Sequence, residues 1–169
     1  MTAQISFRIR PALSDDAAAI AAIYGHHVLH GTGTFEEEPP SEAEMADRLA
    51  KVQARGWPWL VAEQDGRVIG YAYAAQFRDR AAYRFAAEDS IYIHPEHMGI
   101  GVGRALLDTL MAASRQAGFE RMFAVIGDSD NAGSIRLHER ANFDHCGKLD
   151  KAGFKLDRYL DVVFMQREI

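Results

Sequence analysis

The stretch Glu88–Gly118 reads EDSIYIHPEHMGIGVGRALLDTLMAASRQAG and contains three kinds of backbone in succession. Its segment SIYI, Ser90–Ile93, is β-branched and aromatic and predicts a buried strand. The glycines of GIGVG, at 99, 101 and 103, open a helix in which leucines recur at helical spacing. The order of strand, glycine-rich turn and helix predicts free backbone N–H groups at the helix start, where an anion can bind.

The glycine spacing has more than one interpretation. A dinucleotide-binding fingerprint is excluded because Arg104 stands where its third glycine should be, and a phosphate-binding P-loop is excluded because no Gly-Lys-Ser/Thr follows. A tight turn with close packing and a cradle for a diphosphate both fit the remaining pattern.

Length, composition and net charge restrict the classes of protein to which the chain can belong. A chain of 169 residues with 48% hydrophobic residues fits one domain, 1–169, with a substantial core. A net charge of −5 argues against a general nucleic-acid surface. Its single cysteine, Cys146, leaves no internal disulfide, and the N-terminus lacks the apolar core of a signal peptide. We therefore expect a cytoplasmic protein that contacts neither membrane nor nucleic acid.

The remaining elements follow from periodicity and turn signals. Strands are predicted at 5–10, 59–63, 68–75 and 121–126, with two more in 143–166 that join near Ala152-Gly153. Helices are predicted at 14–30, from a capping box at Ser41–Glu44 to about Gly56, and at 131–140. This order lacks the regular alternation of a doubly wound fold. It predicts an α+β fold whose mixed sheet has an antiparallel N-terminal part and one parallel crossover at the central helix.

The chain resembles the GNAT superfamily of N-acetyltransferases. That superfamily carries Gln/Arg-x-x-Gly-x-Gly/Ala where acetyl-CoA's diphosphate binds, and here the segment is MGIGVG, 98–103. Met98 replaces the usual Gln or Arg, which removes a side-chain charge but leaves backbone donation intact. A second superfamily pattern appears as Asn131, Ser134 and His138, followed by Asn142-Phe143 in place of Gly-Phe.

A narrower resemblance covers nearly the whole chain. The segments TGTFEEEP, WPWLVAE, AEDSIYI, AVIGDSDNAGSIRLHE and AGFKLDRYLDVVFMQRE are similar to the phosphinothricin and methionine sulfoximine N-acetyltransferases. It implies a twisted sheet of about seven strands with about four helices, a homodimer, and direct acetyl transfer from acetyl-CoA to the α-amine of phosphinothricin, methionine sulfoximine or methionine sulfone.

The resemblance implies two sets of binding residues. Those expected at acetyl-CoA are Ile91, Tyr92, Ile93, Gly99, Ile100, Gly101, Val102, Gly103, Arg104, Asn131 and Ser134. Those expected at the amino acid are Phe35, Arg78, Asp79, Arg80, Tyr83, Glu88, Asp89, Ser90 and Tyr159. A guanidinium suits a substrate carboxylate because its planar fork matches two oxygens, although exposed arginines in a solvated loop are equally ordinary.

Two residues are implied to be catalytic. Glu88 takes the position of the general base, because an ammonium must lose a proton before it attacks a thioester; otherwise Glu88 and Asp89 are two solvated acids. His138 stands where the superfamily commonly has a tyrosine that protonates the leaving thiolate. It could act as an acid, as a hydrogen-bond donor to the thioester oxygen, or as a packed histidine with a structural role.

Other functions stay open. A protein N-terminal or polyamine acetyltransferase would use the same donor, and a silent acyl-CoA sensor would bind it without chemistry. Three arginines near the expected substrate site, at positions 78, 80 and 84, disfavour a polyamine. His26 and His30 share a helix face, but two histidines without a third ligand do not predict a metal site.

Overall fold

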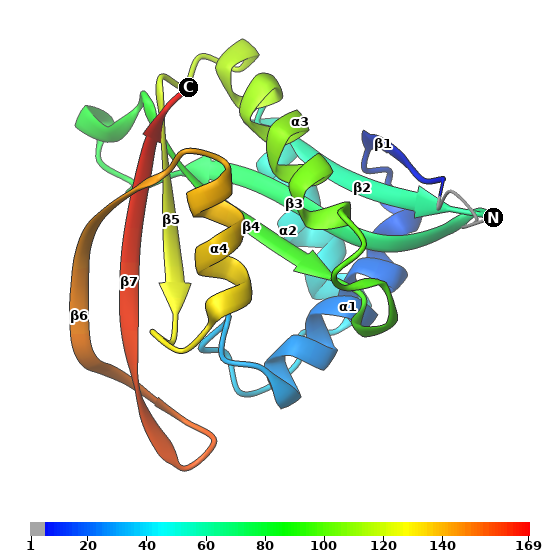
Figure 1. The fold of residues 1–169 in the computed structure, drawn as a ribbon. Helices are drawn as coiled ribbons and strands as arrows, with labels where there is room; N and C mark the ends of the chain where they lie inside the picture. Colours follow the sequence, from blue (N-terminus) through cyan, green and yellow to red (C-terminus); the bar gives the residue numbers. More distant parts are fainter. Residues whose placement is uncertain (1–5) are drawn as a thin grey trace, which may run out of the picture.

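The computed structural model describes residues 6–169 and contains one seven-stranded sheet (Figure 1). In chain order the strands are β1 (Arg8–Pro11), β2 (Trp59–Gln64), β3 (Arg67–Gln76), β4 (Ala86–Ile93), β5 (Arg121–Gly127), β6 (Asp144–Lys155) and β7 (Arg158–Glu168). The α-helices are α1 (Ala17–His30), α2 (Glu42–Ala54), α3 (Val102–Gln116) and α4 (Ala132–Arg140).

The sheet is mixed, with strand order β1-β2-β3-β4-β5-β7-β6. Only β4 and β5 run parallel, and α3 is the crossover between them; all other neighbours are antiparallel. The predicted α+β architecture, with its antiparallel N-terminal part and its single parallel crossover, is confirmed.

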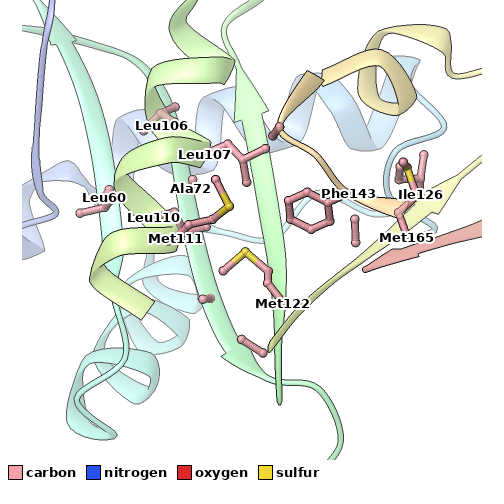
Figure 2. Close-up of a cluster of buried hydrophobic side chains, with 14 of the residues drawn as sticks. Leu60, Ala72, Leu106, Leu107, Leu110, Met111, Met122, Ile126, Phe143 and Met165 are labelled. Carbon is pink, nitrogen blue, oxygen red and sulfur yellow. The ribbon is translucent and has the colours of Figure 1, made fainter. Parts of the chain in front are cut away.

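Helices cover both faces of the sheet. On one face, α1 and α2 bury Ile20 and Leu49 against Trp59 and Tyr71 of β2 and β3. On the other face lie α3 and α4, seen in front of the strands in Figure 1. The leucines of α3 fill the main core there, where they meet Ala72, Met122 and Phe143 (Figure 2). The leucines predicted to recur at helical spacing, at 106, 107 and 110, therefore face the sheet together with Met111.

Local signals of the sequence are largely confirmed. Ser41 and Glu44 form the expected capping box, with each side chain accepting a hydrogen bond from the other's backbone N–H. Gly118 has φ +96° after α3, and Asn142 takes the positive φ, +60°, that its place in Asn-Phe required. Residue 5 of the predicted first strand lies outside the described residues.

Two predicted boundaries were wrong. The last two strands join at Leu156-Asp157 and not near Ala152-Gly153, because those two residues adopt the left-handed turn with φ +52° and +57° that suits a two-residue hairpin. Gly153 lies inside β6, paired with Leu160. Strand β4 begins at Ala86, four residues before the predicted Ser90–Ile93, so Glu88 lies within the strand. In residues 6–169, no helix is both long and apolar enough to be a membrane span.

Candidate active site

Strand β4 turns alternate side chains to the two faces of the sheet. Tyr92 packs with the α1/α2 cluster, whereas Ala87, Ile91 and Ile93 belong to the core under α3. Glu88 shares the parity of Tyr92 and faces α1 and α2. The neighbouring Asp89 faces α3 and α4, so the two acids, although adjacent in sequence, serve different sides of the sheet.

A gap opens between β4 and β5. Their parallel pairing covers only Ala86–Glu88 against Arg121–Phe123, after which β5 pairs with β7 alone. Figure 1 shows the two strands diverging toward their C-terminal ends. Glu88 stands at the last paired position, where the gap begins.

The register of β3 and β4 determines which backbone groups face this gap. The N–H of His94 donates to the carbonyl of Ile69, which makes Tyr71 and Tyr92 a hydrogen-bonded pair. Ile91 and Ile93 consequently turn their N–H and C=O groups toward the gap. Nε2 of His27, on α1, lies 2.8 Å from the Ile93 carbonyl oxygen and donates to it, so Ile91 presents both groups and Ile93 its N–H.

The glycine turn lies beyond the end of β4. Gly99 and Gly101 have φ +77° and +94°, and Gly101 is the N-cap of α3 without a side-chain cap. The first intrahelical bond runs from the N–H of Ala105 to the carbonyl of Gly101 at 3.1 Å. The preceding N–H groups therefore point out of the helix end. A Cβ placed on Gly99 or Gly101 would meet nothing within 4 Å, so the turn is open.

Glu88 and Arg78 lie together at the start of the gap. Nη1 of Arg78 lies 3.5 Å from Oε2 of Glu88, and its guanidinium also covers the Phe77 ring at 4.0 Å. Burial raises the pKa of Glu88; the charge of Arg78 opposes this rise and Asp89 adds to it. A carboxylate with a raised pKa next to a cation has the properties of a general base near an anion site.

The rest of the connection 77–85 is exposed. Gln76 donates to the carbonyls of Arg78 and Arg80 and so fixes the path of the backbone. Tyr83 ends a short 3-10 turn and packs edge-on against Phe77, with 5.8 Å between ring centroids. Asp79 and Arg80 are exposed and directly precede this turn. The structure therefore brings Arg78 to Glu88. The other predicted substrate residues of this segment lie in the same exposed connection.

His138 forms a buried pair with Asp89. Nε2 of His138 lies 3.0 Å from Oδ2 of Asp89, and Nδ1 lies 2.8 Å from the carbonyl oxygen of Ser134. Only 3% of His138 and 7% of Asp89 is exposed. The pair links α4 to β4 on the face opposite Glu88.

The partners of His138 fix its proton count. A carbonyl oxygen only accepts, so Nδ1 carries a proton. The Asp89 carboxylate also only accepts, so its 3.0 Å contact with Nε2 requires a proton between the two atoms. Burial alone would lower the pKa of His138, but the charge of Asp89 and the two hydrogen bonds raise it overall. We conclude that the pair holds one proton between Nε2 and Oδ2.

Three comparisons place this geometry among known proteins. The model of the acetyltransferase (GNAT) family matches residues 20–143. A phosphinothricin N-acetyltransferase of Alcaligenes faecalis is 48% identical over 99% of this chain and 85% of its own length. An L-methionine sulfoximine/L-methionine sulfone acetyltransferase of Salmonella typhimurium is 40% identical over 95% and 94%.

A solved structure agrees with the sequence matches. The phosphinothricin acetyltransferase of Sinorhizobium meliloti, in complex with acetyl-CoA, superposes with a TM-score of 0.93 at 46% identity, covering 96% of this chain and 88% of that one. The chain belongs to the GNAT acetyltransferase family. It is an N-acetyltransferase, as the resemblance implied.

In this GNAT acetyltransferase, the backbone of Tyr92 and the side chain of Arg104 are bound to other protein groups. The backbone of Tyr92 is paired with β3, and its ring lies under the sheet, 4.9 Å from that of Tyr24. The guanidinium of Arg104 binds Asp108 at 2.8 Å and the Arg140 carbonyl at 2.8 Å.

The other predicted site residues stay predictions. Asn131 caps α4, with its Oδ1 accepting from the N–H of Ser134 at 3.2 Å. Ser90 lies opposite Tyr73 in the register, on the Glu88 face. Ile100 is half-buried and Met98 exposed in the glycine turn. In residues 6–169, no group of three histidine, cysteine or acidic side chains is placed to hold a metal.

The His138 ring is buried and enclosed by protein groups. Both ring nitrogens are engaged, and the ring is packed edge-on against Phe143 at 5.0 Å. The Asp89 Oδ1 atom has no hydrogen-bond partner in the described part of the chain. Sequence reasoning missed this pairing because Asp89, on its spacing alone, resembled a solvated neighbour of Glu88.

The buried pair predicts pH-dependent stability. His138→Ala should lower the free energy of unfolding by about 3 kcal/mol or more, because it leaves the Asp89 carboxylate buried without its cation. The pKa of His138 is raised in the folded state, which stabilises the fold at any pH below the pKa of histidine in the unfolded chain. This stabilisation is lost as the pH rises through the folded-state pKa of His138. The difference between wild type and variant should therefore shrink in alkaline solution.

Chemical denaturation at several pH values measures this difference, and kcat measured on the same proteins separates the catalytic roles. His138→Asn retains a donor but cannot titrate near neutrality. Loss of kcat together with the high-pH limb of its profile indicates proton donation to the thiolate. A pH-independent stability difference in His138→Ala would contradict the shared proton.

Proposed function

We propose that the protein transfers acetyl from acetyl-CoA to the α-amine of a small amino-acid analogue of the phosphinothricin, methionine sulfoximine and methionine sulfone class. The proposal rests chiefly on the Arg78–Glu88 pair at the start of the β4–β5 gap. The pair places a cation that can bind the substrate carboxylate beside a base that can deprotonate the substrate amine. The names of the relatives at 48% and 40% identity support this substrate class.

The donor is assigned to the gap and the glycine turn. The N–H groups of Val102, Gly103 and Arg104, at the start of α3, would hold the diphosphate, since a helix N-terminus favours negative charge. The backbone of Ile91 and the N–H of Ile93 would pair with the pantetheine amides as an added strand does. Such main-chain binding orients the thioester near Glu88.

Glu88 is assigned as the general base. Its carboxylate takes one proton from the ammonium, the freed nitrogen lone pair forms the C–N bond, and the C–S electron pair leaves with sulfur. The second proton of the amine ends on the sulfur, which leaves as a thiol. The raised pKa of Glu88 makes it a better proton acceptor than an ordinary carboxylate near neutrality.

The substrate carboxylate is assigned to Arg78, with Arg80, Asp79 and Tyr83 around it. Arg80 has no side-chain hydrogen bond or ion pair with the described residues, so its guanidinium is available to a ligand. Two arginines suit an amino acid better than a cationic polyamine because like charges repel.

A thiol-release assay tests this function against its rivals. With acetyl-CoA, we expect release with the three amino-acid analogues, and N-acetylated products by mass spectrometry, but little with spermidine or with a peptide carrying a free N-terminus. Preference for the peptide or spermidine would replace the proposal by one of the other acetyltransferase functions. Saturable acetyl-CoA binding without release would indicate a sensor.

We also propose a homodimer formed through the β6–β7 hairpin. This hairpin lies at the edge of the sheet and projects beyond its neighbours (Figure 1). Four of its apolar side chains are at least half exposed: Leu149, Phe154, Leu156 and Tyr159. An exposed apolar edge strand favours association with a second copy.

Sedimentation velocity tests the dimer. We expect a dimer for the wild type and a shift to monomer in Phe154→Lys, because the lysine charge would be desolvated at the interface. A wild-type monomer at assay concentration would contradict the proposal.

A further inference from the structure

Lys155, the last residue of β6, is buried although it has no acidic partner. Only 3% of it is exposed, and no carboxylate of the described residues lies within ion-pair distance of its Nζ. Nζ instead donates to the carbonyl oxygens of Gly31 and Thr34, each at 2.8 Å. A charged donor that is buried without a function is uncommon because its desolvation is costly.

Both carbonyls belong to the loop that follows α1. Thr34 is itself buried, and its hydroxyl lies 2.7 Å from that of Tyr24. The neighbouring Phe35 lies against two glycines: a Cβ on Gly127 would come within 2.8 Å of its ring, and one on Gly153 within 2.4 Å. The loop 31–36 is therefore pressed closely onto the ends of β5 and β6.

The position of this loop relates it to the gap. Gly127 ends β5, and Tyr24 packs on Tyr92 near the end of β4. The loop contacts Gly127 and Tyr24, so it crosses the gap where β4 and β5 are farthest apart. Phe35 lies on this loop with 40% of the residue accessible, although its ring rests against the two glycines. A shift of the loop would move that ring relative to anything bound in the gap.

A second anchor fastens the same loop. The Thr32 hydroxyl donates to Oδ2 of Asp128 at 3.0 Å, and Arg158 of β7 binds the same carboxylate at 2.6 Å. Asp128 is buried and holds a positive φ of +76°. Both anchors thus attach the loop to the β6–β7 hairpin and to the end of β5.

We propose that Lys155 is a positioning residue for amino-acid binding: its ammonium holds the loop 31–36 in the shape that presents Phe35 to the substrate. The inference deepens the proposed function and rests on it. Two hydrogen bonds from one ammonium fix the two ends of a four-residue turn, Gly31–Thr34, which a methionine side chain cannot do because it has no donor. Lys155 touches no reacting atom in this account.

Limited proteolysis of the substrate-free protein tests the loop. Lys155→Met keeps the length of the side chain and removes the donors. We expect chymotrypsin to cut after Phe35 at least about tenfold faster in this variant, since the loss of charged hydrogen bonds favours the open loop. Lys155→Arg, which keeps a charged donor, should recover part of the protection. Lys51→Met, at an exposed lysine of α2, should cut like the wild type.

Kinetics then relate the loop to binding. In Lys155→Met, the KM for methionine sulfone should rise at least about tenfold while the KM for acetyl-CoA stays within a factor of about two. Unchanged cleavage in a folded Lys155→Met, or an equal rise of both KM values, would overturn the positioning role. The cleavage rate needs no substrate, so its outcome is independent of the proposed function.

Thr32→Val keeps the test decisive if Lys155→Met fails to fold. It removes only the hydroxyl that binds Asp128. We expect cleavage after Phe35 to accelerate about tenfold, in line with the loss of one hydrogen bond to a charged group. Wild-type cleavage rates in both Thr32→Val and a folded Lys155→Gln would remove the idea that the hairpin holds the loop.

Discussion

Glu88→Gln is expected to lower kcat by about 10²-fold or more at neutral pH, in line with the typical contribution of a general base. The amide keeps the size of the side chain and loses only its basicity. The 3.5 Å contact with Arg78 can persist at the amide oxygen. Glu88 is assigned to no contact with acetyl-CoA, so we expect the KM for acetyl-CoA to change little.

The pH profile gives this variant a second signature. Glu88 must be ionised to accept a proton, so wild-type activity falls as pH falls through its pKa. Burial raises that pKa, which places the acid limb above the usual carboxyl range. The limb should be absent in Glu88→Gln. Glu42→Gln, at an exposed glutamate on α2, is the matched control and should behave like the wild type. A near-normal kcat with the limb intact would assign the proton to another group.

Arg78→Ala is expected to raise the KM for the amino acid roughly 10- to 100-fold, the effect of losing charged hydrogen bonds to a carboxylate. The KM for acetyl-CoA should stay near the wild-type value. A substrate whose carboxylate is amidated should lose little further in this variant because its partner is already absent. If amidation costs the variant as much as it costs the wild type, the carboxylate binds elsewhere.

Arg78 should also set the pH at which Glu88 works. Its charge lowers the pKa that burial has raised, so its removal should move the acid limb to higher pH. Arg78→Lys keeps a charge but not the planar fork. It should return the acid limb close to its wild-type pH while the KM for the amino acid stays raised. Arg115→Ala, an exposed arginine of α3, controls for loss of charge. An acid limb that does not move would show that Arg78 does not influence the ionisation of Glu88.

Short-range chemistry explains why much of the fold could be predicted. The β-branched run at 90–93, the leucine stripe of α3 and the capping box at Ser41 each act over a few residues, and each appeared where expected. The hairpin turn was predicted wrongly because short-range signals alone were considered. Ala152-Gly153 offered a glycine, but the turn formed at Leu156-Asp157, where the pairing of two long strands decides the register.

The long-range contacts of the site could not be predicted. Glu88 and Arg78 were matched by resemblance, but their contact follows from the pairing of β3 with β4. The pairing of His138 with Asp89 joins residues 49 positions apart, and Lys155 lies more than a hundred positions from its loop. A lysine is usually exposed, so no local signal marked its burial.

The alternation of β4 also changes how the acids are interpreted. Glu88 and Asp89 were expected to share a substrate site, yet they face opposite sides of the sheet. Asp89 serves His138 and α4, whereas Glu88 faces α1 and α2 beside Arg78. Adjacent acids in a strand therefore take separate tasks because successive side chains point in opposite directions.

One measurement tests the central claim most directly: thiol release from acetyl-CoA by the wild-type protein with methionine sulfoximine and with its carboxamide. The two acceptors share the α-amine and differ only in the carboxylate assigned to Arg78. Our account predicts release with the free acid and a loss of roughly 10- to 100-fold in kcat/KM with the carboxamide. Equal rates with both acceptors, or no release with either, would contradict it.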